Sequence, residues 1–415
     1  MKRYLRSLML LLARLIGGPG AILAARKAHN RTGERMRILL VRPDHLGDLV
    51  MVTPVLNALK EQVPQAEISM LVGPWSREVV ARHPALKNVE TCIFPGFQRA
   101  AQNPLAPYVL LFQLAGKLRR ERYDLAVNLR PDFWWGAALL YLAGIPRRVG
   151  YAIEPGKPFL THMLPFVETE HASVSNLRLA STALQSVQRA PLAEPFRPEH
   201  YPLRFTPTEQ EKEWVRTQLE AQGIGAEVPL VVIHPGTGGA VKLWRAEGWA
   251  RCADWLVEEG CLLAAGTRIV LTGTPKERPL LEEIAGKMKR AVPVLMSEQS
   301  VGQLAALLAR AELVLGVDNG PLHLAVAQET LTLGLFGPTD VRIFGPWGRE
   351  ERHAVILSGE RCPGCPLIPC GRLDFTEDEL ADHLCVKRIS EEQVEQAIAR
   401  LTGGDEVAGV GRGSA

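Results

Sequence analysis

The sequence predicts an α/β protein made of two parallel-sheet domains that face a central cleft. From Met36 onward, short apolar runs alternate with segments of helical periodicity. A stretch with five prolines in nineteen residues, Arg189 to Pro207, divides this pattern into two halves. In the second half each apolar run ends in a loop rich in Gly, Thr or Asp, and open parallel sheets bind ligands at such loops.

The composition is that of an ordinary globular protein, with 47% hydrophobic and 22% charged residues in a chain of 415. That length suggests about two or three domains. The net charge of +3 hides an asymmetry, because residues 1–37 carry nine Lys or Arg and one Glu. The rest of the chain is therefore slightly acidic, which argues against nucleic acid as a main partner.

Residues 1–35 form a basic amphipathic segment, which we expect to be a helix lying on a membrane surface. Wound as a helix, it places its basic residues and its large apolar residues on opposite sides. Arg14 and the sequence GGPG at 17–20 argue against a spanning helix and against a secretory signal. Those two readings and an ordinary docking helix remain as alternatives.

The predicted domains follow from these patterns. We expect an N-terminal domain at 36–190, a linker at 191–207 and a second domain at 208–387. A C-terminal helix at 388–402 and a disordered tail at 403–415 follow. The first domain should contain strands at 37–42, 66–73, 123–130 and 147–151, and helices at 48–62, 76–82 and 107–122. The second should contain strands within 228–239, 267–274, 311–320 and 330–340.

The stretch HLGDLVMVTP places a carboxylate where the first predicted strand ends. Gly47 permits the turn, and Asp48 begins the helix that we expect after it. Asp48 would cap this helix, or it would take a proton from a substrate at the carboxyl end of the sheet.

In the second domain, HPGTGGAVKLW has the residues of a phosphate-binding loop. Gly236 leaves backbone N–H groups accessible, Thr237 offers a hydroxyl, and Lys242 adds a positive charge. The spacing is neither that of a Walker A loop nor that of a dinucleotide fingerprint. A glycine-rich turn with a solvated lysine is the structural alternative.

The stretch VDNGPLHLAVA supplies a second candidate loop. Asp318 and Asn319 could bind sugar hydroxyls, and Gly320 opens a helix whose start favours an anion. His323 lies on that helix. Alternatively, Asp318 caps the helix and His323 is a buried core residue.

Four of the seven cysteines are spaced C-x2-C-x4-C-x14-C, at Cys362, Cys365, Cys370 and Cys385. This pattern could hold a structural zinc or iron ion, with no open coordination position for catalysis, or it is a loop of reduced thiols. It does not read as a secreted disulfide framework, so we expect a reducing cytoplasm.

Three stretches, ILLVRPDHLGDLVMVTPVLNAL, HPGTGGAVKLW and VDNGPLHLAVA with GLFGPTD, together resemble the signature regions of the bacterial lipopolysaccharide heptosyltransferases, glycosyltransferase family 9. The resemblance covers about residues 36–401. It implies the GT-B fold of two Rossmann-like domains, ADP-heptose as donor, inversion without a metal, and work at the inner face of the cytoplasmic membrane. It also implies that Asp48 is the base, that Thr237 and Lys242 contact the donor, and that Asp318, Gly320 and His323 form a third element. Some related protein heptosyltransferases hold iron with four such cysteines.

We therefore expect an inverting glycosyltransferase that moves heptose from ADP-heptose, or from another nucleotide sugar, to an anionic lipid-linked acceptor of the lipopolysaccharide inner core. No cofactor is expected for catalysis. Candidate contacts to the anionic acceptor are Arg42, Arg130, Arg147 and Arg148. The alternatives are a nucleotide-sugar 2-epimerase of GT-B architecture and a catalytically silent membrane-associated scaffold.

Overall fold

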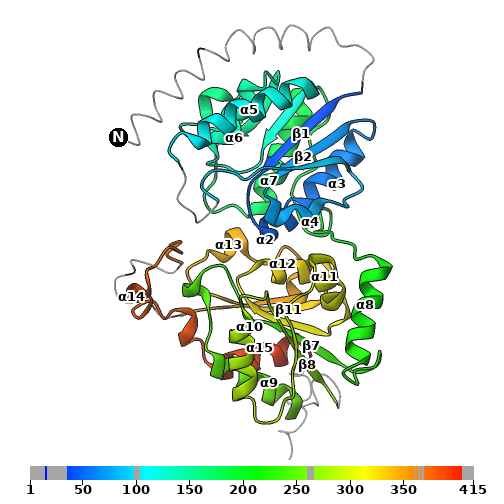
Figure 1. The fold of residues 1–415 in the computed structure, drawn as a ribbon, viewed down its shortest axis with the longest axis vertical. Coiled ribbons are helices and arrows are strands. Elements are labelled where there is room, and N and C mark those ends of the chain that lie inside the picture. The colour runs from blue at the N-terminus through cyan, green and yellow to red at the C-terminus, as the bar shows by residue number, and fades with distance from the viewer. Residues whose placement is uncertain are drawn as a thin grey trace, which may run out of the picture. The chain divides into compact units, whose positions relative to one another are not determined.

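The computed structural model describes residues 15, 35–97, 103–258, 266–359, 361–362, 365 and 369–403. The chain divides into two compact units, Met1–Arg197 and Pro198–Ala415, and their boundary falls within the proline-rich stretch (Figure 1). Most of the expected membrane-surface helix at 1–35, and the tail after residue 403, lie outside the described residues. Among the described residues, no helix combines the length and apolar character needed to cross a bilayer.

Unit 1 contains a six-stranded parallel sheet with the order β3-β2-β1-β4-β5-β6. Its strands are β1 (Arg37–Arg42), β2 (Glu67–Val72), β3 (Leu86–Thr91), β4 (Leu125–Asn128), β5 (Arg147–Tyr151) and β6 (His162–Leu164). The buried apolar residues of β1 alternate between the two faces of the sheet. Leu39 and Val41 pack with the helices α5 (Ala106–Glu121) and α6 (Trp134–Leu142).

The remaining helices of unit 1 are α2 (Leu46–Val50), α3 (Thr53–Gln62), α4 (Arg77–Val80) and α7 (Ala172–Ser186), with short 3₁₀ turns η1 (Pro74–Ser76) and η2 (Lys157–Phe159). The expectation of one helix from residue 48 to 62 is wrong. Two helices stand there, because Pro54 lies in the first turn of α3 and cannot donate a hydrogen bond back to α2. Thr53 Oγ1 instead donates to the Val50 carbonyl at 2.7 Å.

Unit 2 also contains a six-stranded parallel sheet, with the order β12-β11-β10-β7-β8-β9. Its strands are β7 (Leu230–His234), β8 (Arg268–Thr272), β9 (Val294–Met296), β10 (Leu313–Val317), β11 (Leu331–Phe336) and β12 (His353–Leu357). Two parallel sheets confirm the predicted α/β class with two Rossmann-like domains. The four short or half-exposed outer strands, β3, β6, β9 and β12, were not predicted.

The unit 2 sheet is covered by helices on both faces. On one face α9 (Ala246–Glu258), α10 (Arg278–Lys287) and α15 (Glu391–Leu401) pack around the buried Trp244 and Trp249. The other helices are α8 (Glu209–Glu220), α11 (Val301–Arg310), α12 (Gly320–Ala327), α13 (Val341–Phe344) and α14 (Glu377–Leu380), with 3₁₀ turns η3 (Ala240–Lys242), η4 (Glu350–Arg352) and η5 (Val386–Arg388).

Both sheets have the same topology once each is numbered from its own first strand. Chain order runs outward from β1 through β2 to β3, then returns to β4 on the other side of β1, and β7 to β12 repeat this order. The direction of winding therefore reverses between β1 and β4, and again between β7 and β10. In open parallel sheets, ligands bind beyond the carboxyl ends of the strands at such a reversal point.

Candidate active site

At the reversal point of unit 2, the loops after β7 and β10 are joined by Asn319. This residue caps α12, since its Oδ1 accepts a hydrogen bond from Leu322 N at 3.0 Å. Its Nδ2 donates to the carbonyls of His234 at 3.2 Å and Gly236 at 2.9 Å. One buried amide thus satisfies three backbone groups from two segments and fixes the glycine loop against the helix start. The alternative that Asp318 caps this helix is wrong.

Asp318 instead pairs with the lysine of the glycine loop. Lys242 Nζ lies 3.0 Å from Asp318 Oδ2, and their side chains are only 14% and 10% exposed. Thr237 Oγ1 donates to the Asp318 backbone carbonyl at 3.2 Å. The structure therefore brings together Thr237, Lys242 and Asp318, which lie in two separate sequence motifs.

Gly236 lies directly against the carboxylate of Glu277. A Cβ atom added at Gly236 would lie 2.1 Å from Glu277 Oε1, so only glycine fits without displacing that side chain. The carboxylate is held in turn by Thr274, which donates from its backbone N at 2.7 Å and from Oγ1 at 2.8 Å. An ordered carboxylate therefore lies beside the glycine loop.

Two histidines of this region are buried. His234 ends β7, its Nδ1 lies 2.9 Å from Thr272 Oγ1, and burial lowers its pKa to about 4, despite the opposing effect of Glu277. His234 is therefore neutral near pH 7. His323 is 4% exposed on α12, which matches the core-residue alternative, and Gly320 is the first residue of that helix.

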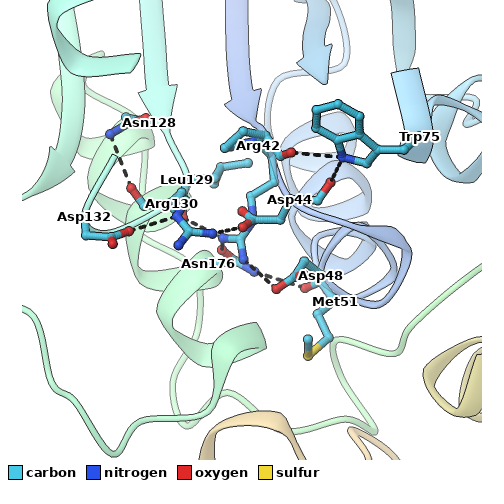
Figure 2. A network of polar contacts seen from close by, with 11 residues as sticks. Arg42, Asp44, Asp48, Met51, Trp75, Asn128, Leu129, Arg130, Asp132 and Asn176 are labelled. Atoms are coloured by element: carbon cyan, nitrogen blue, oxygen red, sulfur yellow. Dashed lines mark hydrogen bonds and ion pairs between the residues drawn. The ribbon is translucent and has the colours of Figure 1, made fainter. Parts of the chain in front are cut away.

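At the reversal point of unit 1, Arg42 ends β1 and makes contacts on every side of its guanidinium group (Figure 2). Its Nη1 donates to the Leu129 carbonyl after β4 at 2.8 Å and to Asn176 Oδ1 of α7 at 3.2 Å. Its Nε lies 2.6 Å from Asp44 Oδ2, and its Nη2 donates to Asp48 Oδ1 at 3.2 Å. One buried cation thus holds two carboxylates.

Asp44 is the more deeply buried of these carboxylates. It pairs with Arg42 and also with Arg130, which follows β4. Burial raises the pKa of Asp44, while both arginines oppose the rise and the nearby Asp48 adds to it. Arg130 is shared further, with Asp132 Oδ1 at 2.9 Å.

Asp48 lies within the first turn of α2 and does not cap it. The N-cap position is His45, and no side chain there accepts a capping hydrogen bond, so the capping alternative for Asp48 is wrong. Gly47 before it is buried, whereas the Asp48 side chain is 27% exposed. The carboxylate is thus anchored by Arg42 and still reaches solvent, as a group that exchanges protons with a substrate must.

Trp75 supports the loop that carries these carboxylates. Its Nε1 donates to the backbone carbonyls of Pro43 at 3.2 Å and Asp44 at 2.9 Å (Figure 2). Its ring lies so close to Gly73 that a Cβ there would fall 2.1 Å from the indole. The Trp75 ring also stacks on the ring of Phe97, with the two ring centroids 6.1 Å apart.

The comparisons with known proteins identify the family of this chain. The family model of glycosyltransferase family 9 (heptosyltransferase) matches residues 111–365, more than half of the chain. The chain belongs to glycosyltransferase family 9. It is therefore a glycosyltransferase, which disfavours the epimerase and scaffold alternatives.

Individual relatives support the same assignment. Lipopolysaccharide heptosyltransferase 3 of Escherichia coli is 26% identical over 317 residues, which cover 73% of this family 9 chain and 84% of the relative. The crystal structure of a family 9 glycosyltransferase from Veillonella parvula superimposes with a TM-score of 0.70 at 19% identity, covering 90% and 99% of the two chains. The E. coli heptosyltransferase WaaC with ADP gives 0.63 at 20% identity, covering 88% and 100%. These structures confirm the GT-B fold class.

The cysteine segment, by which we mean the stretch that carries Cys362, Cys365, Cys370 and Cys385, packs on other loops of unit 2. All four predicted cysteines line one small cavity, together with Val241, Gly337, Pro338, Phe375 and His383. The ligand atoms of Cys362, Cys365 and His383 lie within 4.8 Å of one another, and Cys365 Sγ is 3.3 Å from His383 Nδ1. These soft sulfur and nitrogen donors suit zinc or iron. His383 was not predicted, although a histidine two residues before Cys385 is a sequence signal for such a site.

The candidate acceptor arginines mostly serve the fold of the family 9 chain. Arg148 is buried and donates to the carbonyls of Phe159, at 2.6 Å, and Ile145. Arg147 Nε donates to the Ser186 carbonyl at 3.0 Å, and Arg42 is fully used within its cluster. Arg130 is 34% exposed and is thus the member of this set that retains access to solvent beside Asp48 and Asp44.

Proposed function

We propose that this protein transfers heptose from ADP-heptose to an acceptor of the lipopolysaccharide inner core, with inversion at the anomeric carbon. The observation that carries the proposal is the position of two polar clusters at the reversal points of the two sheets, in a chain of glycosyltransferase family 9. A relative named for lipopolysaccharide heptosyl transfer and a structural neighbour solved with ADP support the donor and acceptor classes.

The donor is assigned to unit 2. Gly236 and Thr237 supply backbone N–H groups for a diphosphate, while the Thr237 hydroxyl holds the loop to the Asp318 carbonyl, and Lys242 supplies a cation beside them. Asp318, Asn319, Gly320 and His323 complete this region: Asp318 orients Lys242, Asn319 fixes the loop, and α12 directs the positive end of its dipole outward from Gly320. Negative charge that grows on the leaving ADP is stabilised by Lys242 and the loop amides.

The base is assigned to Asp48. The acceptor hydroxyl loses its proton to the Asp48 carboxylate while its oxygen forms a bond to the anomeric carbon of the heptose. The bond from that carbon to the diphosphate oxygen breaks, and its electron pair leaves with ADP. Gly47 is buried immediately before Asp48, and Arg42 donates to the carboxylate at Oδ1. No cofactor takes part in these steps.

The acceptor is proposed to be an anionic, lipid-linked glycan at the inner face of the cytoplasmic membrane. Arg130 is the described cation with solvent access nearest to the unit 1 cluster, and a guanidinium suits phosphate and carboxylate groups. The basic amphipathic segment at 1–35 would attach the protein to the anionic membrane surface. The protein would then be cytoplasmic and peripherally membrane-bound, with no nucleic-acid partner.

A donor screen and one substitution test this function. Purified protein is incubated with ADP-heptose, ADP-glucose, a UDP-sugar or a GDP-sugar, with and without a heptose-free inner-core acceptor. We expect transfer only with ADP-heptose and acceptor. Asp48→Asn should lower kcat by about 100-fold to 10,000-fold while ADP affinity is retained. Glu213→Gln, an exposed carboxylate on α8 of unit 2, is the control. Transfer from a UDP-sugar, or an active Asp48→Asn variant, would contradict the proposal.

We also propose a structural zinc or iron ion at the cysteine segment, held by Cys362, Cys365 and His383 with Cys370 or Cys385 as the fourth ligand. The metal would stabilise the loops at Val241 and Gly337, which line the same cavity. Elemental analysis of protein purified without chelators should find one metal per chain. Cys365→Ser and His383→Gln should lose it, and Cys92→Ala, a buried cysteine in unit 1, should keep it. Purified protein that contains no metal, and in which the four cysteines of this segment are reactive thiols, would overturn this assignment.

A further inference from the structure

The guanidinium of Arg42 is buried beneath the carboxylate of Asp48, and its orientation is fixed by several segments of unit 1. Leu129, after β4, and Asn176, on α7, both accept hydrogen bonds from Nη1. Asp44, after β1, pairs with Nε at 2.6 Å. A guanidinium group is planar, so the two hydrogen bonds from Nη1 also restrict the direction of Nη2, while Asp44 Oδ2 lies beside Nε as an ion-pair partner without a hydrogen bond.

Nη2 is the nitrogen that donates to Asp48 Oδ1, at 3.2 Å (Figure 2). The Arg42 side chain is 7% exposed, whereas that of Asp48 is 27% exposed. The hydrogen bond is therefore anchored from the protein interior, and the accessible part of the carboxylate is directed away from its anchor. A hydrogen bond to one carboxylate oxygen leaves the other, Oδ2, as the atom that accepts a proton.

Asn176 joins this arrangement to the helix that carries Asp48. Its Oδ1 accepts from Arg42 Nη1 at 3.2 Å, and its Nδ2 donates to the carbonyl of Met51 at 3.3 Å. Met51 is the C-cap residue of α2, and Asp48 lies within that helix. Asn176 is 1% exposed, so both of its hydrogen bonds lie in the interior, where leaving a polar group unpaired is costly. One amide thus fixes both the arginine and the helix relative to each other.

We infer that Arg42 is a positioning residue for Asp48, which holds Oδ1 and presents Oδ2 to the acceptor hydroxyl, and that Asn176 sets the geometry of the pair. This inference rests on the proposed function, because it requires Asp48 to be the base. The charged groups that face Asp48 are Arg42 and Asp44, with Arg130 on the far side of Asp44. Arg42 thus also supplies the positive charge that keeps two neighbouring carboxylates together.

Three substitutions separate the geometric contribution of Arg42 from its charge. Arg42→Lys keeps the positive charge but loses the planar group of several N–H donors. It should lower kcat by about 100-fold with little change in the KM for the donor. Arg42→Gln removes both the cation and the planar group of donors, and should lower kcat at least as far as Arg42→Lys, again with little change in the KM for the donor. Asn176→Ser retains both charges, so a fall in kcat with an unchanged KM for the donor would come from geometry alone.

Folding is checked by circular dichroism and thermal unfolding, and ADP affinity, which is assigned to unit 2, should be the same in every variant. Arg148→Lys is the matched control, because Arg148 is a similarly buried arginine of unit 1 that contacts only backbone carbonyls and an aromatic ring. It should leave kcat within about twofold of the wild type. If Arg42→Lys and Asn176→Ser keep kcat within about twofold of the wild type while Asp48→Asn is inactive, the inference fails and the proposed function stands. If Asp48→Asn is itself active, the proposed function fails. Should the Arg42 variants not fold, Asn176→Ser decides.

Discussion

Lys242 and Asp318 form an ion pair of 3.0 Å across 76 positions of the chain, at the point where the unit 2 sheet reverses its winding. The ion pair orients the Lys242 ammonium group independently of any ligand. It also keeps a buried carboxylate satisfied in a region that we assign to an anionic diphosphate. Asp318 therefore acts mainly on the lysine, and its influence on the donor passes through that contact.

Removing the ammonium group should impair catalysis more than it impairs folding. We expect Lys242→Met to lower kcat by about 100-fold to 1,000-fold, because a preorganised cation stabilises the charge on the leaving ADP. Asp318→Asn should weaken transfer less, and the double variant should be non-additive, with a coupling energy on the order of 1 kcal/mol. Steady-state kinetics of the four proteins measure this. Lys212→Met, an exposed lysine on α8, should behave like the wild type, and strictly additive effects of Lys242→Met and Asp318→Asn would count against their coupling.

Two glycines of the same loop provide a matched pair of substitutions. Gly236→Ala places a Cβ atom against the Glu277 carboxylate, whereas nothing lies within 4 Å of a Cβ at Gly238. We expect Gly236→Ala to raise the KM for the donor by about tenfold or more, because Glu277 or the loop must move. Gly238→Ala should change it by less than about threefold. Equal effects of the two substitutions, measured with ADP-heptose, would show that Glu277 does not constrain the loop.

The buried His234 should make unit 2 less stable in acid. Its folded pKa of about 4 lies below the ordinary value of 6.5, so between these pH values the unfolded chain binds a proton that the folded chain does not. Above about pH 6.5 His234 is neutral in both states and costs no stability. As the pH falls toward 4, protonation of His234 in the unfolded chain lowers the free energy of unfolding by on the order of 3 kcal/mol in total. Urea unfolding at several pH values should show a smaller acid loss for His234→Asn than for the wild type.

Two partly buried histidines set the baseline of that experiment. Burial also lowers the pKa values of His83 and His353 to about 4, so part of the acid sensitivity should remain in the variant. An identical pH dependence of the free energy of unfolding in wild type and His234→Asn would contradict the assignment.

Asn319 should affect both stability and nucleotide affinity. Asn319→Ala removes the cap of α12 and leaves the carbonyls of His234 and Gly236 without their amide donor, so we expect a loss of about 2 kcal/mol in the free energy of unfolding. Because the loop is released, ADP affinity should fall as well. Ser300→Ala removes the corresponding cap of α11 and should cost about 1 kcal/mol without changing ADP affinity. Calorimetric ADP titrations of both variants distinguish these outcomes, and unaltered binding by Asn319→Ala would refute the loop argument.

Much of the fold could be predicted from the sequence because the central strands are continuous apolar runs. β1, β7 and β10 are almost completely buried, and each ends in a motif that marks the turn. β3 could not be found in this way, since LKNVET has half-exposed and polar positions throughout, and β6 and β9 are only three residues long. Outer strands bury fewer side chains and so carry a weaker pattern.

The candidate site was predicted in part. The motifs identified Asp48, Thr237, Lys242 and Asp318, because these residues stand at strand ends beside glycines. Asp44 and Asn176 were missed, since nothing in the local sequence shows that a carboxylate at position 44 and an amide 134 residues after Arg42 meet at one guanidinium. Such contacts depend on the tertiary arrangement of β1, β4 and α7. Arg42 was predicted as a candidate contact to the acceptor, and in the structure its side chain pairs with Asp44 and Asp48.

The three hydrogen bonds of Asn319 also bear on the thermodynamics of nucleotide capture. A flexible glycine loop normally loses a large amount of conformational entropy when it becomes ordered around a bound phosphate. Here the folded protein already restrains the backbone at His234 and Gly236. The entropy of ordering this loop is therefore lost when the protein folds, and not when ADP binds. The protein should consequently bind ADP with a favourable enthalpy that is little offset by loss of chain freedom.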